Sequence, residues 1–386
     1  MKRSLVGLAL FLTFAAAAAA QMGKRVSVAA GTPEDKDLAE IYAATDGPDK
    51  VALLDKFMAD FGSNGDLALL DDQLYEQTYL AQKNYAKVYE YGEKVLALDP
   101  DDLPAAVNMV HAAEEQGDTA KLFASGEKAA AVLAHFKAEP APADVSAQDW
   151  ANTKEEGFKS SQGDISYVEY ALANAAFKTA DPAARATLCE RYAAAFPDAP
   201  YTASIREQAA VAYQQAQNIP KMLETAQAIL VSDPNNVAML LLLSDYWSGA
   251  GKELDKAAAD AQKAIDLLAQ AKKPDNLTDA QWQQQVSVQK GLAYSALGQV
   301  LVTKTKNVPA VDAFQKASPL LKSDTVSYAR NLYRLGFTLA KMQRTAEART
   351  VLTEAVSLNT PWKAPAQETL DKIGGAVARH PARKTS

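Results

Sequence analysis

The sequence has little cysteine, glycine, proline and histidine for its 386 residues. Its one cysteine, Cys189, cannot form an intramolecular disulfide, so stability must come from packing. The 18 glycines and 17 prolines are too few for the many turns of a β-sandwich or barrel. Ala, Leu, Gln, Glu and Lys are abundant, and all five favour helices. The composition therefore predicts an all-α protein and excludes a disordered chain, because 48% of the residues are hydrophobic.

The chain also lacks a basic surface. Its formal net charge is −7, which does not suit the positive footprint of a nucleic-acid binder. Only residues 376–386 are basic, and we expect a disordered tail there. The sequence therefore predicts no nucleic-acid partner.

Residue patterns that carry catalysis are missing. There are three histidines and no Gly-rich phosphate loop, Cys-x-x-Cys pair or Gly-x-Ser-x-Gly turn. His111, Glu114 and Glu115 share one helix face, which is typical of a solvated surface; a weak metal site is the less favoured alternative. Cys189 lies in an apolar helical pattern and is predicted to be buried. We therefore expect no enzyme, no cofactor and no metal.

The N-terminus has the pattern of a secretory signal peptide. Lys2 and Arg3 precede an apolar run, Leu5–Ala20, which ends in an Ala-x-Ala sequence. The run is short for a bilayer span of about 20 residues, and no later segment is apolar enough to cross a membrane. We expect cleavage near Ala20 and an exported bacterial protein, periplasmic or secreted. An uncleaved anchor remains the alternative.

Helical segments recur in pairs along the chain, separated by short polar breaks. Two pairs end at Asp99-Pro100 and Asp233-Pro234, because proline cannot continue a helix. In the last pair, the apolar and small positions of the two helices are Leu332, Leu335, Gly336, Leu339, Ala348, Leu352 and Ala355. Small residues at these positions allow two helices to approach closely.

This pattern resembles the tetratricopeptide repeat (TPR) family. Val88 and Leu122 are 34 residues apart, which is the period of that family. The resemblance covers most of residues 34–375. It implies a right-handed α-α superhelix, a TPR-like solenoid of about seven to eight antiparallel helix pairs.

The sequence predicts six segments. They are a signal peptide (1–20), a flexible mature N-terminus (21–33), N-terminal TPR-like helix pairs (34–138), a Pro/Ala linker with an extended helix (139–163), C-terminal TPR-like helix pairs with an insertion at 270–282 (164–375), and the basic tail (376–386). N-cap candidates at Ser146 and Thr278 are each expected to begin a helix longer than its neighbours.

A longer period suggests an internal duplication. Asp99-Pro100 and Asp233-Pro234 are 134 residues apart, and so are Gly117 and Gly251. We therefore predict that a block of about 130 residues was duplicated, with a partial third copy after it.

The resemblance implies a concave groove that binds a protein or peptide. The residues placed there are Arg330, Tyr333, Phe337, Lys341, Tyr246, Tyr167, Tyr170, Asn174 and Lys178. Tyr and Arg are common anchors of interfaces, but the aromatics would equally suit packing against the next repeat. Arg330 and Arg334 are similar to part of the carboxylate clamp of some family members, although Ser295 and Ala296 stand where an Asn is expected.

Two functions remain open. The first is a non-enzymatic scaffold that binds a protein or peptide in the groove. The alternative is a structural or assembly component of the bacterial cell envelope, acting by large flat contacts or by oligomerisation. Charged residues in the last predicted helix, residues 365–373, indicate a capped end and a finite solenoid.

Overall fold

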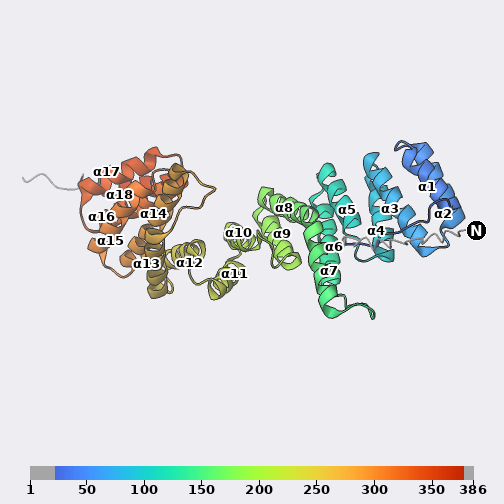
Figure 1. Cartoon of the computed structure of the whole chain (residues 1–386). Coiled ribbons are helices and arrows are strands. Elements are labelled where there is room, and N and C mark those ends of the chain that lie inside the picture. Colours follow the sequence, from blue (N-terminus) through green and yellow to red (C-terminus); the bar gives the residue numbers. More distant parts are fainter. Residues whose placement is uncertain (1–21, 378–386) are drawn as a thin grey trace, which may run out of the picture. The chain divides into compact units, whose positions relative to one another are not determined.

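The structure, a computed structural model, describes residues 22–377. The predicted signal peptide and most of the predicted basic tail lie outside the described residues. Within residues 22–377 every regular element is a helix. The chain divides into two compact units, up to Ile205 and from Arg206 onward (Figure 1). The predicted all-α fold class is confirmed.

The first unit is built of short antiparallel helices joined by tight turns. Its helices are α1 (Pro33–Ala43), α2 (Pro48–Phe61), α3 (Gly65–Ala81), α4 (Tyr85–Leu98), α5 (Leu103–Gln116), α6 (Thr119–Ala138), α7 (Ala147–Ser160), α8 (Gln162–Lys178) and α9 (Pro182–Ala195). Neighbours pair as α1 with α2, α3 with α4, α5 with α6, and α8 with α9. The first helices of successive pairs also touch, because α3 contacts α5 and α5 contacts α8.

The second unit follows the same plan. α10 (Thr202–Gln215) crosses the division between the units, and α11 (Ile219–Ser232), α12 (Val237–Ala250), α13 (Leu254–Gln270), α14 (Asp279–Thr303), α15 (Asn307–Leu320), α16 (Thr325–Lys341), α17 (Thr345–Ser357) and α18 (Lys363–Val377) come after it. The pairs are α12 with α13, α14 with α15, and α16 with α17, while α18 packs against α17 and α16. α18 therefore covers the last pair, as the charged residues of this segment predict.

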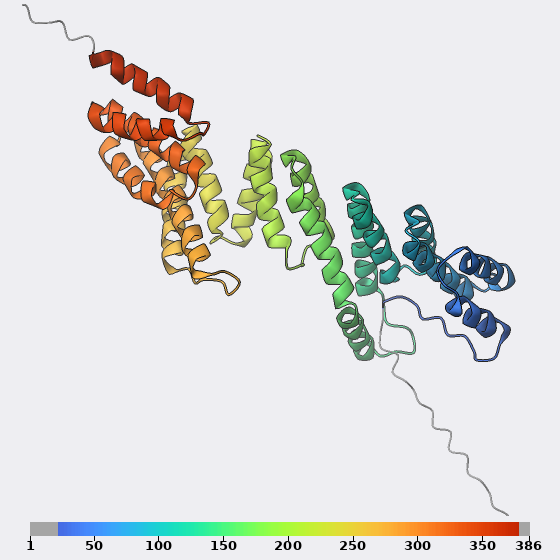
Figure 2. The same cartoon turned by 90° about the horizontal axis from the view of Figure 1, so that it is seen from above.

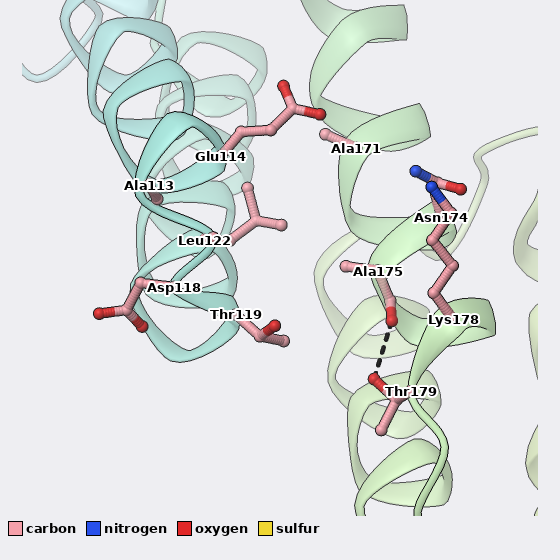
Figure 3. A pocket seen from close by; sticks show the side chains of 11 residues that line it. Ala113, Glu114, Asp118, Thr119, Leu122, Ala171, Asn174, Ala175, Lys178 and Thr179 are labelled. Atoms are coloured by element: carbon pink, nitrogen blue, oxygen red, sulfur yellow. Dashed lines mark hydrogen bonds between the residues drawn. The ribbon is translucent and has the colours of Figure 1, made fainter.

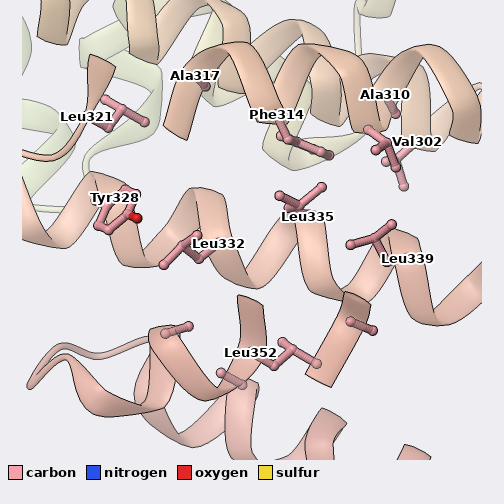
Figure 4. Close-up of a cluster of buried hydrophobic side chains, with 14 residues drawn as sticks. Val302, Ala310, Phe314, Ala317, Leu321, Tyr328, Leu332, Leu335, Leu339 and Leu352 are labelled. Atoms are coloured by element: carbon pink, nitrogen blue, oxygen red, sulfur yellow. The ribbon is translucent and has the colours of Figure 1, made fainter. Parts of the chain in front are cut away.

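The cores lie in the seams between paired helices. In the last two pairs, Phe314 and Leu352 are fully buried against Leu332 and Leu335 of α16 (Figure 4). Burying a Leu or Phe side chain contributes roughly 1.5–3 kcal/mol. The small residues do what the repeat pattern predicts, since a Cβ added at Gly336 would lie 2.5 Å from Leu352. Gly336 therefore sets the spacing of α16 and α17.

The helix bounds agree with the predicted duplication. α4 and α5 of the first unit are each 14 residues long, and so are α11 and α12, which begin 134 positions later. The turn residues repeat with them: Lys83 and Gln217 both have φ 57°, and Gln343 has φ 61°. Gly117 and Gly251 end α5 and α12 in the same left-handed conformation.

The two predicted extended helices differ. Thr278 forms a capping box with Gln281 and begins α14, which has 25 residues and is the longer helix that we expected. Ser146 caps α7, but this helix has only 14 residues. The chain breaks at Ser161, whose backbone leaves the helix, and continues as the separate helix α8. The expectation of an extended helix is therefore wrong at Ser146.

The predicted flexible segment 21–33 is also different from expectation. Met22 is only 1% exposed, and residues 22–28 pack on the first unit (Figure 2). The contacts that hold this segment come from helices far away in the sequence.

Among the described helices, none has the length and apolar character that a membrane crossing needs.

Candidate functional site

The predicted residues of α16 form a stripe along one side of this helix. Tyr333 is half-buried and stacks on Trp362, with ring centroids 5.5 Å apart. Phe337 is 40% exposed and lies one turn further on, next to Tyr333. Lys341 places its ammonium 5.8 Å from the Phe337 ring centre. The stripe thus combines packing at one end with an accessible aromatic ring at the other.

Arg330 begins this stripe and is part of a charged cluster. Its Nη1 donates to Asp245 Oδ2 of α12 at 2.8 Å. Arg334, one turn later, lies 3.7 Å from the other oxygen of Asp245 and donates to Ser295 Oγ of α14 at 3.3 Å. One carboxylate therefore faces two guanidinium groups, and the cluster keeps a net positive charge.

Burial lowers the pKa of Arg334, the more enclosed of the two arginines. The Arg334 side chain is 10% exposed. Burial and the charge of Arg330 lower the pKa of Arg334 to about 10, while Asp245 acts in the opposite direction. Arg334 stays charged at neutral pH, so the cluster can attract an anionic group.

A pocket of about 560 Å³ lies beside the cluster. Arg330 and Trp362 line it together with Val326 at the start of α16. The other lining residues come from α10, α12, α14 and α16: Val211, Gln214, Ala238, Leu241, Leu242, Asp245, Gln289, Leu292 and Ser327. The pocket is thus an apolar hollow with one guanidinium, one carboxylate and two side-chain amides on its wall.

Sequence reasoning missed two of these residues, Asp245 and Trp362. Asp245 precedes Tyr246, which we did predict, on α12. Tyr246 is half-buried and is not among the described residues that line this pocket. Trp362 lies in the turn before α18, and its only signal is its place after Pro361 near the end of the repeats.

The second predicted stripe lies on α8 of the first unit. Tyr167 stacks on His111 of α5, with centroids 4.1 Å apart, and its hydroxyl donates to Glu114. Tyr170 is 54% exposed. Tyr167 is therefore a packing residue between two first helices, while Tyr170 faces solvent.

Asn174 and Lys178 line a smaller pocket of about 390 Å³ between α8 and the α5–α6 turn (Figure 3). Glu114 and Asp118 stand on the opposite side of it. Its walls carry charges of both signs and few large apolar groups, so it offers less to a side-chain anchor than the pocket of the second unit.

The alternative of a metal site at His111 finds no support. Glu114 accepts the hydroxyl of Tyr167, and Glu115 accepts the hydroxyl of Tyr85. The two carboxylates therefore accept hydrogen bonds from different tyrosines. Among the described residues there is no cluster of three or more His, Cys, Asp or Glu that could hold a metal ion. Cys189 is buried, as predicted, and burial raises the pKa of its thiol to about 11.

No protein-family model matches the sequence, and no curated protein matches it. Many solved structures are similar to it, and three of them are described below. Yeast Tom70 is 13% identical, with 94% of this chain and 68% of that chain covered and a TM-score of 0.40. Cut9–Hcn1 of the APC/C is 14% identical, with 89% and 64% covered and a TM-score of 0.45. The TPR domain of P58(IPK) is 14% identical, with 91% and 100% covered and a TM-score of 0.27.

With identities of 13–14% and TM-scores of 0.27–0.45, these three structures carry no argument about this chain. The assignment rests instead on the chain itself, on its paired antiparallel helices, its contacts between successive first helices and its close approaches at small residues. The chain is a TPR-like helical-repeat protein.

Proposed function

We propose that the chain is a non-enzymatic scaffold that binds a protein or peptide in the pocket beside Arg330. The observation that carries the proposal is the Arg330–Asp245 pair on the wall of an apolar hollow, with the guanidinium of Arg334 3.7 Å from the same carboxylate. Arg330 has further N–H groups that can bond a carboxylate of a ligand, and an apolar wall favours an aliphatic or aromatic side chain. The ligand that fits is a peptide segment with an acidic group next to a large apolar residue.

The surroundings of the pocket suit a macromolecular partner. Phe337 and Lys341 continue from the pocket along α16, so a longer segment has further groups to contact. Exposed aromatic rings and arginines are the residue types that most often anchor protein interfaces. Reaction chemistry has no comparable support, because no nucleophile with an activating base was found in the sequence.

We also propose that the protein works outside the cytoplasm, in the periplasm or after secretion. Support comes only from residues 1–20, whose basic start, apolar run and Ala-x-Ala end are typical of an exported protein. Intact-mass measurement of the chain recovered from its native host tests this proposal. A mass that starts at Gln21 supports it, and a chain that retains residues 1–20 contradicts cleavage.

A charge placed in the pocket tests the binding proposal. Val326 lines the pocket and is 52% exposed, so Val326→Asp adds a negative charge there without disturbing the core. We expect it to weaken binding of peptides selected from a random library on the wild-type chain by at least tenfold. Val308→Asp, on α15 of the same unit and 68% exposed, is the matched control and should leave binding unchanged.

Selected peptides should be rich in acidic and large apolar residues. If Val326→Asp and Val308→Asp bind them equally well, the pocket is not the site. Association through large flat contacts, as in an envelope assembly, would then be the better account, and self-association measured by light scattering would show it.

A further inference from the structure

Residues 22–28 cross the first unit as a non-helical segment before α1 (Figure 2). Two of their apolar side chains reach into the repeat. Met22 is 1% exposed, and Val26 packs on Leu69 of α3 with Val95 and Ala105. The segment therefore lies against α3, the end of α4 and the start of α5, where successive helix pairs meet.

Polar contacts fix the segment at the same place. The backbone N–H of Lys24 donates to the carboxylate of Asp99, the C-cap of α4. The Lys24 ammonium lies 2.6 Å from Asp66 in the first turn of α3. Gly23 has φ 96°, and a Cβ there would lie 3.2 Å from the Cα of Asp102. The contact thus selects an apolar residue, then glycine, then a basic residue.

The duplicated copy shows what the same surface looks like elsewhere. Asp233 stands 134 positions after Asp99 with nearly the same backbone, φ −128° against −136°. Asp233 is exposed, and its second oxygen is bonded by the side chain of Asn236. Asp99 is only 9% exposed, and Lys24 holds its second oxygen. The segment, and not the repeat, is therefore what buries Asp99.

We propose that this face of α3 and α5 is a peptide-binding surface whose resident ligand is the N-terminal segment of the same chain. The described contacts of the segment include two buried or half-buried apolar side chains, one ion pair and one backbone hydrogen bond, and no helix of the repeat is built from it. A chain that begins at Gln21 keeps every residue of the ligand. The preferred occupant is an extended peptide with an apolar, a small and a basic residue in that order.

Room beside the segment supports exchange of the occupant. A pocket of about 320 Å³ lies between residues 22–27 and the two helices. Gln73, Gln77 and Asn108 line its helical side with side-chain amides. The amide nitrogens of Gln73 and Asn108 already donate to Asp102 and Glu76. The amide oxygens and the Gln77 amide can bond the backbone of a peptide that fills more of the surface than residues 22–28 do.

Cutting the chain after the segment tests the proposal. Ala29, Ala30 and Gly31 are exposed, so a protease recognition sequence placed there lets the segment be separated from the folded mature protein. We expect the cut segment to dissociate on dilution. A fluorescent synthetic peptide of residues 21–30 should then rebind with one-to-one saturation, and the uncut chain should not bind it.

Two peptide variants define the contact. Met22→Asp places a charge in a buried position and should weaken rebinding at least tenfold. Ala30→Asp carries the same charge at an exposed position and should bind like the unmodified peptide. Higher salt should weaken binding of both the unmodified and the Ala30→Asp peptide, because the Lys24–Asp66 pair is exposed.

Three results would overturn the proposal. The first is that the rest of the chain stays helical by circular dichroism after the segment is released but does not rebind the peptide. The second is that the rest of the chain unfolds when the segment is released, because the segment is then a structural part and not a ligand. The third is a dimer of the uncut chain that disappears when residues 21–28 are deleted, since the segment would then occupy a second copy.

Discussion

The carboxyl group of Glu76 on α3 faces the bare backbone of Gly92 on α4. A Cβ added at Gly92 would lie 2.5 Å from Glu76 Oε1 and 3.0 Å from the side chain of Met109. In the duplicated block the same two positions are Ala210 and Ala226, both fully buried. A large side chain and a glycine thus take the place of two small ones.

Gly92→Ala should therefore destabilise the first unit by about 1–3 kcal/mol through overpacking. The double variant Glu76→Ala/Gly92→Ala recreates the alanine pair of the second unit and should lose less stability than the sum of the single variants. Hydrogen exchange of amides in α3 and α4 measures this, because a two-unit chain need not unfold in one step. If the double variant loses as much stability as the two single variants together, the two positions are not coupled.

Glu76 should also make the stability of the first unit depend on pH. Burial raises the pKa of Glu76 to about 9, and burial raises that of Asp71 to about 8. The folded state therefore keeps protons that the unfolded state loses above the ordinary pKa values, 4.5 for Glu76 and 3.8 for Asp71. Stability should be greatest at mildly acidic pH and fall as pH rises from about 5 to 9.

Glu76→Gln mimics the protonated carboxyl and should flatten this dependence. We expect it to raise the stability of α3 and α4 more at pH 8 than at pH 5.5. Glu93→Gln, at an exposed position of α4, is the control and should leave the slope unchanged. A steeper fall of stability in Glu76→Gln would contradict a buried neutral acid.

A second pair of positions shows the same duplication, but the amide and the carboxylate have changed places between the two copies. Gln73 Nε2 donates to Asp102 Oδ2 at 2.6 Å, and 134 positions later Asn236 Nδ2 donates to Glu207 Oε1 at 2.6 Å. Gln73→Glu alone puts a second carboxylate in contact with that of Asp102, which is only 3% exposed. We expect a loss of about 1–3 kcal/mol at neutral pH. Gln73→Glu/Asp102→Asn should restore most of it, as thermal unfolding would show; no recovery would mean that the bond itself is unimportant.

Cys189 offers a direct measure of packing in α9. The thiol is buried and burial raises its pKa to about 11, so little thiolate forms at neutral pH. Labelling with a maleimide at pH 7 should be at least tenfold slower in the native chain than in denaturant. Fast native labelling would show that α9 opens readily.

Helix pairing could be predicted from the sequence because its causes are local. Thr278 and Gln281 are three residues apart and form the expected capping box. Gly336 and Leu352 repeat a small-and-large pattern that belongs to paired helices in general. Such signals do not depend on the rest of the chain.

Contacts between distant residues could not be predicted in this way. Lys24 bonds Asp99 across 75 positions, and nothing in the sequence of residues 22–28 indicates a partner. The stacking of Tyr333 on Trp362 and the pairing of Arg330 with Asp245 depend on how helices pack around them. Tyr333 and Phe337 lie next to each other on α16, whereas Tyr167 stacks on His111 and joins α8 to α5.

The left-handed turns that repeat along the chain have a consequence for its length. Each closes within its own six residues: the N–H of Asn84 donates to Tyr79 O at 2.8 Å, that of Asn218 to Tyr213 O at 2.9 Å, and that of Arg344 to Leu339 O at 2.9 Å. The geometry of such a turn does not depend on which helices follow it. Whole helix pairs can therefore be gained or lost without altering the turns that remain, and related chains should differ in length by complete pairs.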